Sequence, residues 1–307
     1  VHVGITAARV VLVVPVLTKT GVFWFITIPA VVTAAALPAY APDVTNGETV
    51  FNAGGCTSCH GVRGQPRTML GGGLAMASPF GTFHAPNISP HPQDGIGNWS
   101  EADFVTAMTR GTSPARTHYY PAFPYGSYRL ATTQDIRDLF AYIKTLPPVA
   151  GRVRDHDLRF PFNIRRLVGV WKFLFLDTAP FVPDPQQSAA WNRGAYLVNG
   201  LGHCAECHSP RNALGGIVAA QRFAGGPDPE GRGWVPNITQ KGLRDWSEKD
   251  IAYFLKTGEL PDGDSAGGSM APVIRNTSLL SDDDRAAMAA YLKSLPPVDG
   301  PVRPKRS

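Results

Sequence analysis

The four cysteines constrain this chain more than any other feature, because they form two copies of one pattern. The copies are Cys56-Thr57-Ser58-Cys59-His60 and Cys204-Ala205-Glu206-Cys207-His208. A C-x-x-C-H pattern spaces two thiols for thioether bonds to one haem, and its histidine binds the iron from the proximal side. The sequence therefore predicts two covalently bound haem c groups. The residues that would hold them are Cys56, Cys59, Cys204 and Cys207, with His60 and His208 on the two irons.

Two other uses of paired cysteines compete with this interpretation, a redox-active dithiol and half of a zinc site. Two copies that are each followed by histidine, and that together use every cysteine, argue against both. The 32 glycines and 28 prolines favour compact modules with long structured loops. The net charge of +5 is modest and its basic residues are scattered, with one short run at Arg303, Lys305 and Arg306, so we expect no nucleic-acid partner.

The chain repeats itself at a period near 149 residues. Four landmarks recur with offsets of 148, 150, 147 and 149 residues, and the pairs are Cys56 and Cys204, Pro86 and Pro236, Trp99 and Trp246, and Leu146 and Leu295. The repeat predicts one haem domain that has been duplicated. The predicted segments are an N-terminal membrane anchor (1–42), a first haem domain (43–150), a linker (151–192), a second haem domain (193–300) and a basic tail (301–307).

Both halves carry the same helix signals, so we expect a mainly α fold. Ser100 and Ser247, each with an aspartate three residues later, resemble capping boxes that open helices over 101–109 and 248–257. These helices should stop at Gly111 and Gly258.

A last helix in each half should begin near Thr132 and near Ser281 and end before Pro147 and Pro296. Apolar residues recur there at helical spacing, and they are Leu139, Tyr142 and Ile143, and Met288, Tyr291 and Leu292. We expect these faces to pack on the first helix of each domain, with the tyrosines as core residues and not redox groups.

The linker contains an amphipathic pattern between Phe162 and Phe175. Its apolar stripe is Ile164, Leu167, Val168, Trp171, Leu174 and Phe175, while Arg165, Arg166 and Lys172 lie off the stripe. Such a helix could lie on anionic lipid or dock a partner subunit. The sequence favours a simpler role, a connector packed between the two haem domains.

The N-terminal segment has the composition of a membrane anchor. Residues 20–42 carry no charge, and a second apolar run, Val10 to Leu17, precedes them. One spanning helix fits there. Arg9 and Lys19 on its N-terminal side would leave the haem domains outside the cytoplasm, facing the periplasm from a bacterial inner membrane.

Two features complicate this anchor. Lys19, Pro15 and Pro29 interrupt it, so the sequence does not fix its ends. A cleaved signal peptide is the alternative, because residues 39–41 resemble a cleavage site. Pro42 directly after them argues against cleavage there, and we favour a retained anchor.

The sixth iron ligand should differ between the two halves. In the second half, Met270 follows Gly267 and Gly268 ahead of the last helix, where c-type cytochromes carry a methionine ligand. A His/Met haem suits electron transfer without a substrate at the metal. The residue at the corresponding distance from Trp99 is Phe123, which cannot ligate iron. Open alternatives for the first haem are Met76, Met108, His84, His118 or a free coordination position.

Longer motifs bring out a family resemblance. The runs 80–88, 95–100 and 120–125, and in the second half 204–212 and 268–271, resemble the cytochrome c subunits of bacterial membrane-bound dehydrogenases. The alcohol dehydrogenase cytochrome subunit is the best-known relative. The likeness covers about residues 43–298 and implies two tandem cytochrome c domains, with Cys56, Cys59, His60, Cys204, Cys207, His208 and Met270 as haem ligands.

The resemblance also implies a function. Such a subunit takes electrons from a dehydrogenase or another redox protein and delivers them to quinone, another cytochrome or an oxidase, while the substrate chemistry resides in the partner. This chain departs from the pattern in two ways. It has two haem motifs where these subunits commonly have three, and relatives place a methionine at the position of Phe123 or at that of Ala131.

Two rival functions remain. An open first iron could bind peroxide while the second haem supplies electrons, which would make the protein a dihaem cytochrome c peroxidase. An assembly subunit with mainly structural haems is the third possibility. We expect the electron-transfer function, since two redox cofactors are a poor way to build a scaffold.

Overall fold

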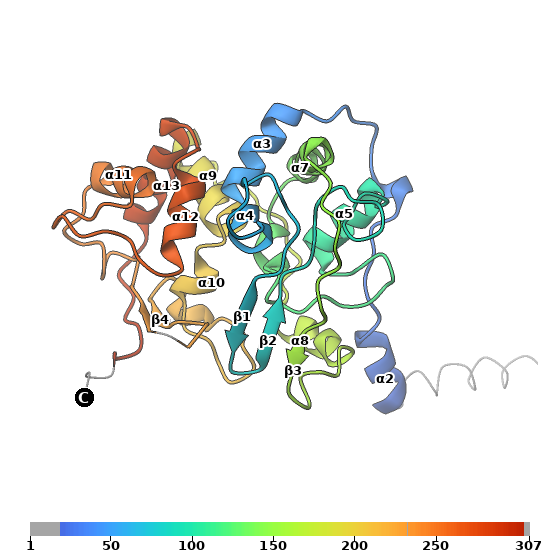
Figure 1. Ribbon diagram of the computed structural model, residues 1–307. Helices are drawn as coiled ribbons and strands as arrows, with labels where there is room; N and C mark the ends of the chain where they lie inside the picture. The colour runs from blue at the N-terminus through green and yellow to red at the C-terminus, as the bar shows by residue number, and fades with distance from the viewer. Residues whose placement is uncertain (1–18, 232, 304–307) are drawn as a thin grey trace, which may run out of the picture.

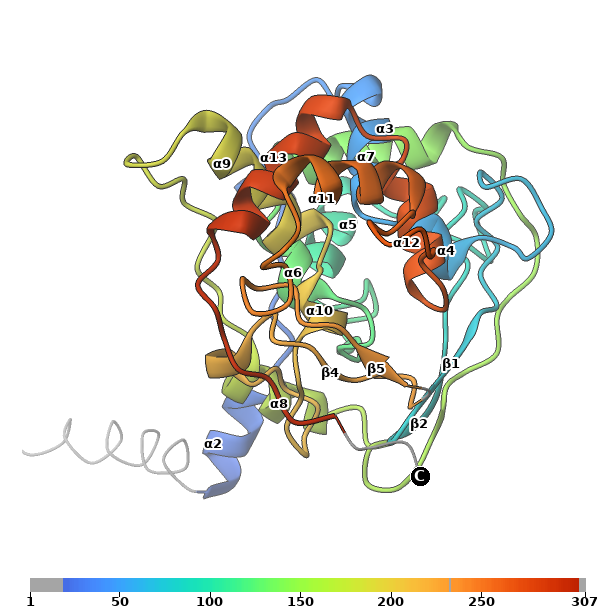
Figure 2. The ribbon, with the colours of Figure 1, turned by 90° about the vertical axis from the view of Figure 1, so that its left-hand side faces the viewer.

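Two helical units stand side by side in the computed structural model, which describes residues 19–231 and 233–303 (Figure 1). The first unit runs from blue to green, and the second runs from yellow to red. The turned view in Figure 2 shows the helices of the second unit in front of those of the first. The mainly helical, duplicated fold predicted from the repeat is confirmed. Most of the predicted basic tail, from residue 304 on, lies outside the described residues.

The first unit is built around a crossing of its first and last helices. Its helices are α3 (Val44–Ala53), α4 (Cys56–His60), α5 (Glu101–Arg110), α6 (Tyr125–Tyr128) and α7 (Thr133–Thr145). Gly47 of α3 lies at the crossing, where a Cβ would come 2.1 Å from the backbone oxygen of Asp138 in α7. Glycine therefore lets the two helix backbones approach this closely.

The second unit repeats this plan. Its elements are α9 (Ala189–Tyr196), the π-helical turn η3 (Leu197–Leu201), α10 (Ala205–His208), the short turn η4 (Ala219–Gln221), α11 (Glu248–Thr257), α12 (Met270–Thr277) and α13 (Asp282–Ser294). Gly194 of α9 is the counterpart of the first crossing glycine, because a Cβ there would lie 1.9 Å from the backbone oxygen of Ala287 in α13.

The predicted helix ends agree closely with the structure. Ser100 and Ser247 both form complete capping boxes with the aspartate three residues later. Gly111 (φ +58°) and Gly258 (φ +80°) end these helices in the left-handed conformation, as C-terminal glycines do. The first helix extends one residue beyond the predicted end, to Arg110.

The last helix of each unit also begins as predicted, with Thr132 and Ser281 as N-caps. The tyrosines of the predicted apolar faces contact the first helices. The ring of Tyr142 lies 5.2 Å from that of Phe51 in α3, and the ring of Tyr291 lies 5.1 Å from that of Trp191 in α9. The predicted packing of these faces is therefore confirmed.

Short strands flank the helices. The strands β1 (Ala75–Ser78), β2 (Gly81–His84) and β3 (Asp157–Leu158) form an antiparallel sheet, and β4 (Gly226–Pro227) pairs with β5 (Trp234–Val235). Because β3 belongs to the linker, the sheet ties the start of the linker to the first unit.

One hydrophobic core runs through both units. Its largest fully buried members include Phe51, Ile136 and Leu139 from the first unit and Leu197 and Val198 from the second. The two units are therefore packed against each other through buried apolar side chains.

A polar contact crosses the same boundary. The hydroxyl of Tyr196 in α9 accepts from the backbone nitrogen of Thr132 (2.9 Å) and donates to the carboxylate of Asp135. This contact joins the second unit to the N-terminus of α7.

The N-terminal segment differs from the expected spanning helix. Helix α2 covers only Lys19–Ile26 and is followed by an extended segment with one short turn, η2 (Ala34–Ala36). The helix ends at a buried Thr27, whose hydroxyl donates back to the carbonyl of Phe23 (2.7 Å), and Pro29 disfavours helix in the residue before it. In the part of the chain that the structure describes, no helix is long and apolar enough to cross a membrane. The apolar run Val10 to Leu17 lies outside that part.

Residues 27–42 instead run along the first unit. The backbone nitrogen of Val32 donates to Thr106 (2.9 Å), and the carbonyl of Pro38 accepts from the guanidinium of Arg137 (2.7 Å). The hydroxyl of Tyr40 donates to Asp138 (2.9 Å). Residues of this uncharged segment are therefore bonded to the surface of the first unit.

The linker helix α8 (Leu167–Phe175) contacts both units, as the favoured interpretation predicts. Gly169 packs against His118 of the first unit, while the indole nitrogen of Trp171 donates to the backbone oxygen of Leu214 in the second (3.0 Å). The predicted apolar stripe is only partly buried, because Leu174 is exposed.

Candidate haem sites

The first C-x-x-C-H motif forms the short helix α4, which orients its histidine. Nδ1 of His60 lies 2.8 Å from the backbone oxygen of Pro86. A carbonyl oxygen only accepts, so this nitrogen carries the proton and Nε2 keeps its lone pair for a metal. Burial lowers the pKa of His60, which favours the neutral ring that iron requires.

The second motif has the same geometry. Nδ1 of His208 lies 2.8 Å from the backbone oxygen of Pro236, and burial again lowers the pKa of the ring. The carbonyl oxygens of His60 and His208 also accept from Gly72 and Gly225, at 2.8 Å in both units. The structure thus fixes two imidazoles in one tautomer with the metal-binding nitrogen free.

The cysteines suit covalent attachment better than redox cycling. Burial raises the pKa of Cys56 and Cys204 to about 12 and that of Cys207 to about 11. A redox dithiol depends on a depressed thiol pKa, so these surroundings count against that alternative. Paired thiols beside an oriented imidazole fit a covalently bound haem, and the thioether bonds of Cys56, Cys59, Cys204 and Cys207 stay a prediction.

Met270 is the predicted sixth ligand of the second haem. It is the first residue of α12, after Gly267, Gly268 and Ser269, and it packs half-buried against the shared core. Gly268 has a φ of +56°, so glycine is needed at this turn into the helix. Its role as iron ligand remains our prediction.

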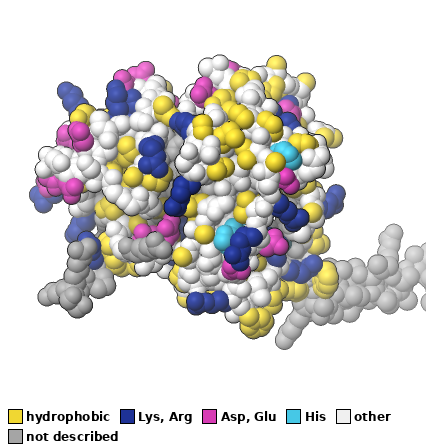
Figure 3. Space-filling view, in the orientation of Figure 1, with side chains coloured by type: hydrophobic (Ala, Val, Ile, Leu, Met, Phe, Trp, Pro, Cys, Tyr) yellow, Lys and Arg dark blue, Asp and Glu magenta, His cyan; other side chains and the backbone are white. Residues whose placement is uncertain are grey.

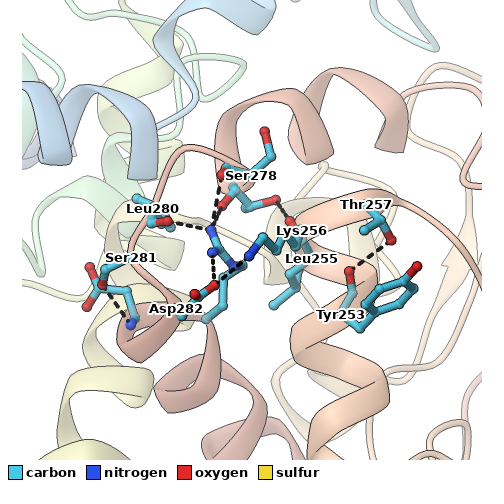
Figure 4. Close-up of polar contacts among 11 residues, drawn as sticks. Tyr253, Leu255, Lys256, Thr257, Ser278, Leu280, Ser281 and Asp282 are labelled. Atoms are coloured by element: carbon cyan, nitrogen blue, oxygen red, sulfur yellow. Dashed lines mark hydrogen bonds and ion pairs between the residues drawn. The ribbon is translucent and has the colours of Figure 1, made fainter.

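The far end of α12 is held by a buried arginine (Figure 4). Arg285 of α13 donates to the backbone oxygens of Thr277 (2.9 Å) and Ser278 (3.1 Å), and it pairs with Asp282. Lys256 of α11 also pairs with Asp282 (3.0 Å), and the hydrogen bonds from Arg285 and Lys256 lower the pKa of that carboxyl. Arg285 thus attaches the end of α12 to α13, and the hydroxyl of Thr277 donates to the backbone oxygen of Leu255 in α11 (2.6 Å).

The first unit has a phenylalanine where the second has this methionine. Phe123 lies just before α6 and packs against the shared core, with its ring 5.8 Å from those of Tyr119 and Tyr128. The aromatic cluster occupies the place that the ligand turn takes in the second unit.

The two candidate methionines have different surroundings. Met108 is a buried residue of α5 in the shared core. Met76 of β1 packs against a smaller cluster formed by Phe83, Tyr120 and Val168. Both therefore have a packing role in the structure.

The two candidate histidines are also buried. Nε2 of His118 lies 3.0 Å from the backbone oxygen of Thr27 and so donates to it. His84 of β2 lies 3.8 Å from Asp157. None of the four candidates repeats the arrangement of Met270, and we keep the expectation that the two haems differ in ligation.

A buried asparagine links the two sites, and sequence reasoning missed it. Asn276 of α12 accepts from the hydroxyl of Thr57 (2.9 Å) and donates to that of Ser58 (2.9 Å), both inside the first C-x-x-C-H motif. It also accepts from Arg67 (3.1 Å) and donates to the backbone oxygen of Pro272 (2.8 Å). Helices α12 and α4 lie side by side in both ribbon views (Figures 1 and 2). The helix that begins with Met270 is therefore bonded directly to the first haem motif.

The second motif also contacts the first unit across the boundary. Ser127 of α6 donates to the carboxylate of Glu206, inside the second motif (2.8 Å), and the ring of Tyr128 lies 5.4 Å from that of His203. These contacts hold the second motif against the first unit.

Comparison with known families identifies these units. The Cytochrome c family model matches the chain twice, at residues 44–147 and 192–296. The chain belongs to the cytochrome c family. Each match contains one C-x-x-C-H motif, and the cytochrome carries two covalently bound haem c groups, as the motifs predict.

Its relatives include components of dehydrogenases. The cytochrome is 51% identical over 260 residues to a diheme cytochrome c-type protein of Cereibacter sphaeroides, covering 84% of this chain and 87% of that one. It is 42% identical over 258 residues to a subunit of the nicotinate dehydrogenase of Pseudomonas putida (83% of this chain, 21% of that one). It is 37% identical over 267 residues to the cytochrome c subunit of alcohol dehydrogenase (quinone) of Gluconobacter oxydans (83% and 55%).

These comparisons confirm the family resemblance. The cytochrome is a dihaem member homologous to electron-transfer subunits of dehydrogenase complexes. It spans about half or less of the length of the dehydrogenase subunits that it matches.

Proposed function

We propose that this cytochrome relays electrons from a dehydrogenase partner to a respiratory acceptor on the periplasmic face of a bacterial inner membrane. The observation that carries the proposal is the packed boundary between the two haem units, across which Asn276 bonds the first haem motif to the helix that begins with Met270. The rate of electron tunnelling falls steeply with the distance between two cofactors. Two haem sites held at a fixed distance by a packed boundary are therefore suited to passing electrons between them.

The residues of the chain supply orientation and insulation in this relay. Each bound haem supplies one-electron redox chemistry. Pro86 and Pro236 fix the two imidazoles, and the shared core keeps water from the protein side of both sites. Met270 would stabilise the reduced iron of the second site, because a thioether ligand raises the potential.

The partners follow from the relatives. Relatives are named as subunits of nicotinate and alcohol dehydrogenases, so a dehydrogenase subunit is the proposed donor. Quinone, a second cytochrome or an oxidase is the proposed acceptor. We place the haem domains in the periplasm because haem c proteins are extracytoplasmic, and because Arg9 and Lys19 lie on the N-terminal side of the apolar segment.

Reduction by a dehydrogenase tests the relay. The haem-loaded protein should be reduced when it is mixed with a dehydrogenase encoded beside it and that enzyme's substrate, and it should pass these electrons to an added cytochrome or quinone. Omission of the substrate is the control. Failure of reduction with every neighbouring dehydrogenase would contradict the proposed donor.

Peroxide reduction is the alternative function. It is favoured by one observation: Phe123 stands where the second unit has Met270, so the first iron could have a free position for peroxide. The reduced protein should show no turnover with hydrogen peroxide, and carbon monoxide should leave the spectrum of the second haem unchanged. Rapid catalytic consumption of peroxide would instead support a dihaem peroxidase.

A further inference from the structure

The end of α2 and the linker helix α8 expose large apolar side chains that the relay does not use. Trp24, Phe25 and Ile28 are 55%, 74% and 62% exposed, and Phe173 and Leu174 of α8 are 69% and 56% exposed. We call these five residues the α2–α8 surface. Figure 3 shows a few apolar side chains at the lower right of the molecule, beside the grey atoms, where α2 lies in Figure 1.

The two elements form one continuous surface. Helices α2 and α8 pack so closely at Gly169 that a Cβ there would lie 2.7 Å from the Cα of Thr27. The guanidinium of Arg166 stacks 3.7 Å from the ring of Trp24 and donates to the hydroxyl of Thr27 (3.0 Å). A groove of about 280 Å³ between the elements is lined by Ile28 and Phe173 from the two sides. The α2–α8 surface is therefore held in one shape.

The linker segment that carries α8 is basic in sequence. Residues 151–176 contain six basic residues and two acidic residues, a difference of +4 out of +5 for the whole chain. The next acid, Asp177, pairs with Arg129 (3.1 Å). Aromatic and aliphatic side chains next to arginine, as Trp24 lies beside Arg166, are a combination that binds the surface of an anionic bilayer.

The sequence that leads into α2 points to the same occupant. The eight residues from Val10 to Leu17 carry no charge and end two residues before α2 begins. This strongly apolar stretch is therefore continuous in sequence with α2. Such a stretch suits contact with lipid, whereas contact with a soluble partner protein does not require it.

We propose that the α2–α8 surface lies in the interface of a bilayer containing anionic lipid and so sets the orientation of the two haem domains on the membrane. This proposal rests on the membrane location in the proposed function, and it adds a contact made by the interdomain linker. Trp24 would sit at the level of the lipid head groups, as interfacial tryptophan does, while Arg166 meets the phosphates.

A fluorescent label at Leu174 tests this contact. The four native cysteines are bound in thioether bonds, so Leu174→Cys in the full haem-loaded chain should react selectively with a polarity-sensitive fluorophore. In vesicles of phosphatidylcholine and phosphatidylglycerol, we expect a blue shift and a severalfold rise in emission over the protein in detergent-free buffer. The effect should weaken in vesicles of phosphatidylcholine alone.

A matched position provides the control. Leu279 lies between α12 and α13 and is 52% exposed, so Leu279→Cys offers an equally accessible leucine in the second unit. Its label should not respond to vesicles. If the emission of the label at position 174 stays that of an aqueous environment while the protein is bound to vesicles, the proposal is overturned. A blue shift of this label caused by a soluble protein in the absence of lipid would also overturn it.

The same sample separates this proposal from the relay. Electron delivery to an added acceptor, measured on the labelled protein, reports the proposed function alone. If electron delivery is lost while the label still responds to lipid, the relay is refuted and the membrane contact stands. If electron delivery is intact while the label does not respond to lipid, only the membrane contact is refuted.

Discussion

Asn276→Ala should loosen the boundary between the two haem units. The side chain makes four hydrogen bonds, three of which reach Thr57, Ser58 and Arg67 in the first unit. Each such bond contributes about 1 kcal/mol net. Arg67 keeps its bond to Asn52 (2.7 Å), and the two hydroxyls can rotate toward other acceptors. We therefore expect the free energy of unfolding to fall by about 2 to 3 kcal/mol, less than the sum of four bonds.

Urea unfolding of the haem-loaded protein measures this loss. The red charge-transfer band of a Met-ligated haem should weaken in the variant before global unfolding, because Asn276 also bonds Pro272 in the first turn of α12. Ser278→Ala is the matched control, since its exposed hydroxyl bonds only to Arg275 in its own helix. A variant with unchanged stability and an unchanged band would refute the reasoning that this residue couples the two sites.

Three further predictions concern other parts of the chain. Met270→Leu should leave the second haem attached but lower its potential, which a redox titration measures, and an unchanged potential would make Met270 a core residue only. Burial lowers the pKa of Lys172 from 10.5 to about 7, so the unfolded chain binds more protons between these values. The free energy of unfolding should therefore rise with pH across that window, and Lys172→Met, followed by urea unfolding at several pH values, should remove this part of the slope. Deleting residues 1–18 behind a cleavable secretion signal should release folded protein from strong membrane attachment in a sedimentation assay, whereas deleting residues 1–42 should destabilise it, because Tyr40 and Val32 bond to the first unit.

Local signals in the sequence predicted much of the fold. The capping boxes at Ser100 and Ser247 depend on residues three positions apart, so their pattern is readable without tertiary structure. The repeat predicted the duplicated unit because four landmarks recur within two residues of one offset. The C-x-x-C-H motifs predicted the cofactor because covalent attachment dictates both spacing and residue type.

Contacts between residues far apart in the sequence could not be predicted from such local signals. The Asn276 to Thr57 bond joins residues 219 positions apart, and neither residue belongs to a pattern that marks a contact. The segment 20–42 was expected to span a membrane because its composition is uncharged, yet Tyr40 and Val32 hold its second half on the first unit. Composition alone cannot distinguish an apolar segment that meets lipid from one that meets protein.

A spectroelectrochemical titration of the haem-loaded protein tests the central claim most directly, that two unlike haems form one relay. The account predicts two separated one-electron steps, both reversible, with Met270→Leu lowering the potential of one step and leaving the other in place. A single step that accounts for both haems, or a substitution that shifts both steps equally, would contradict it.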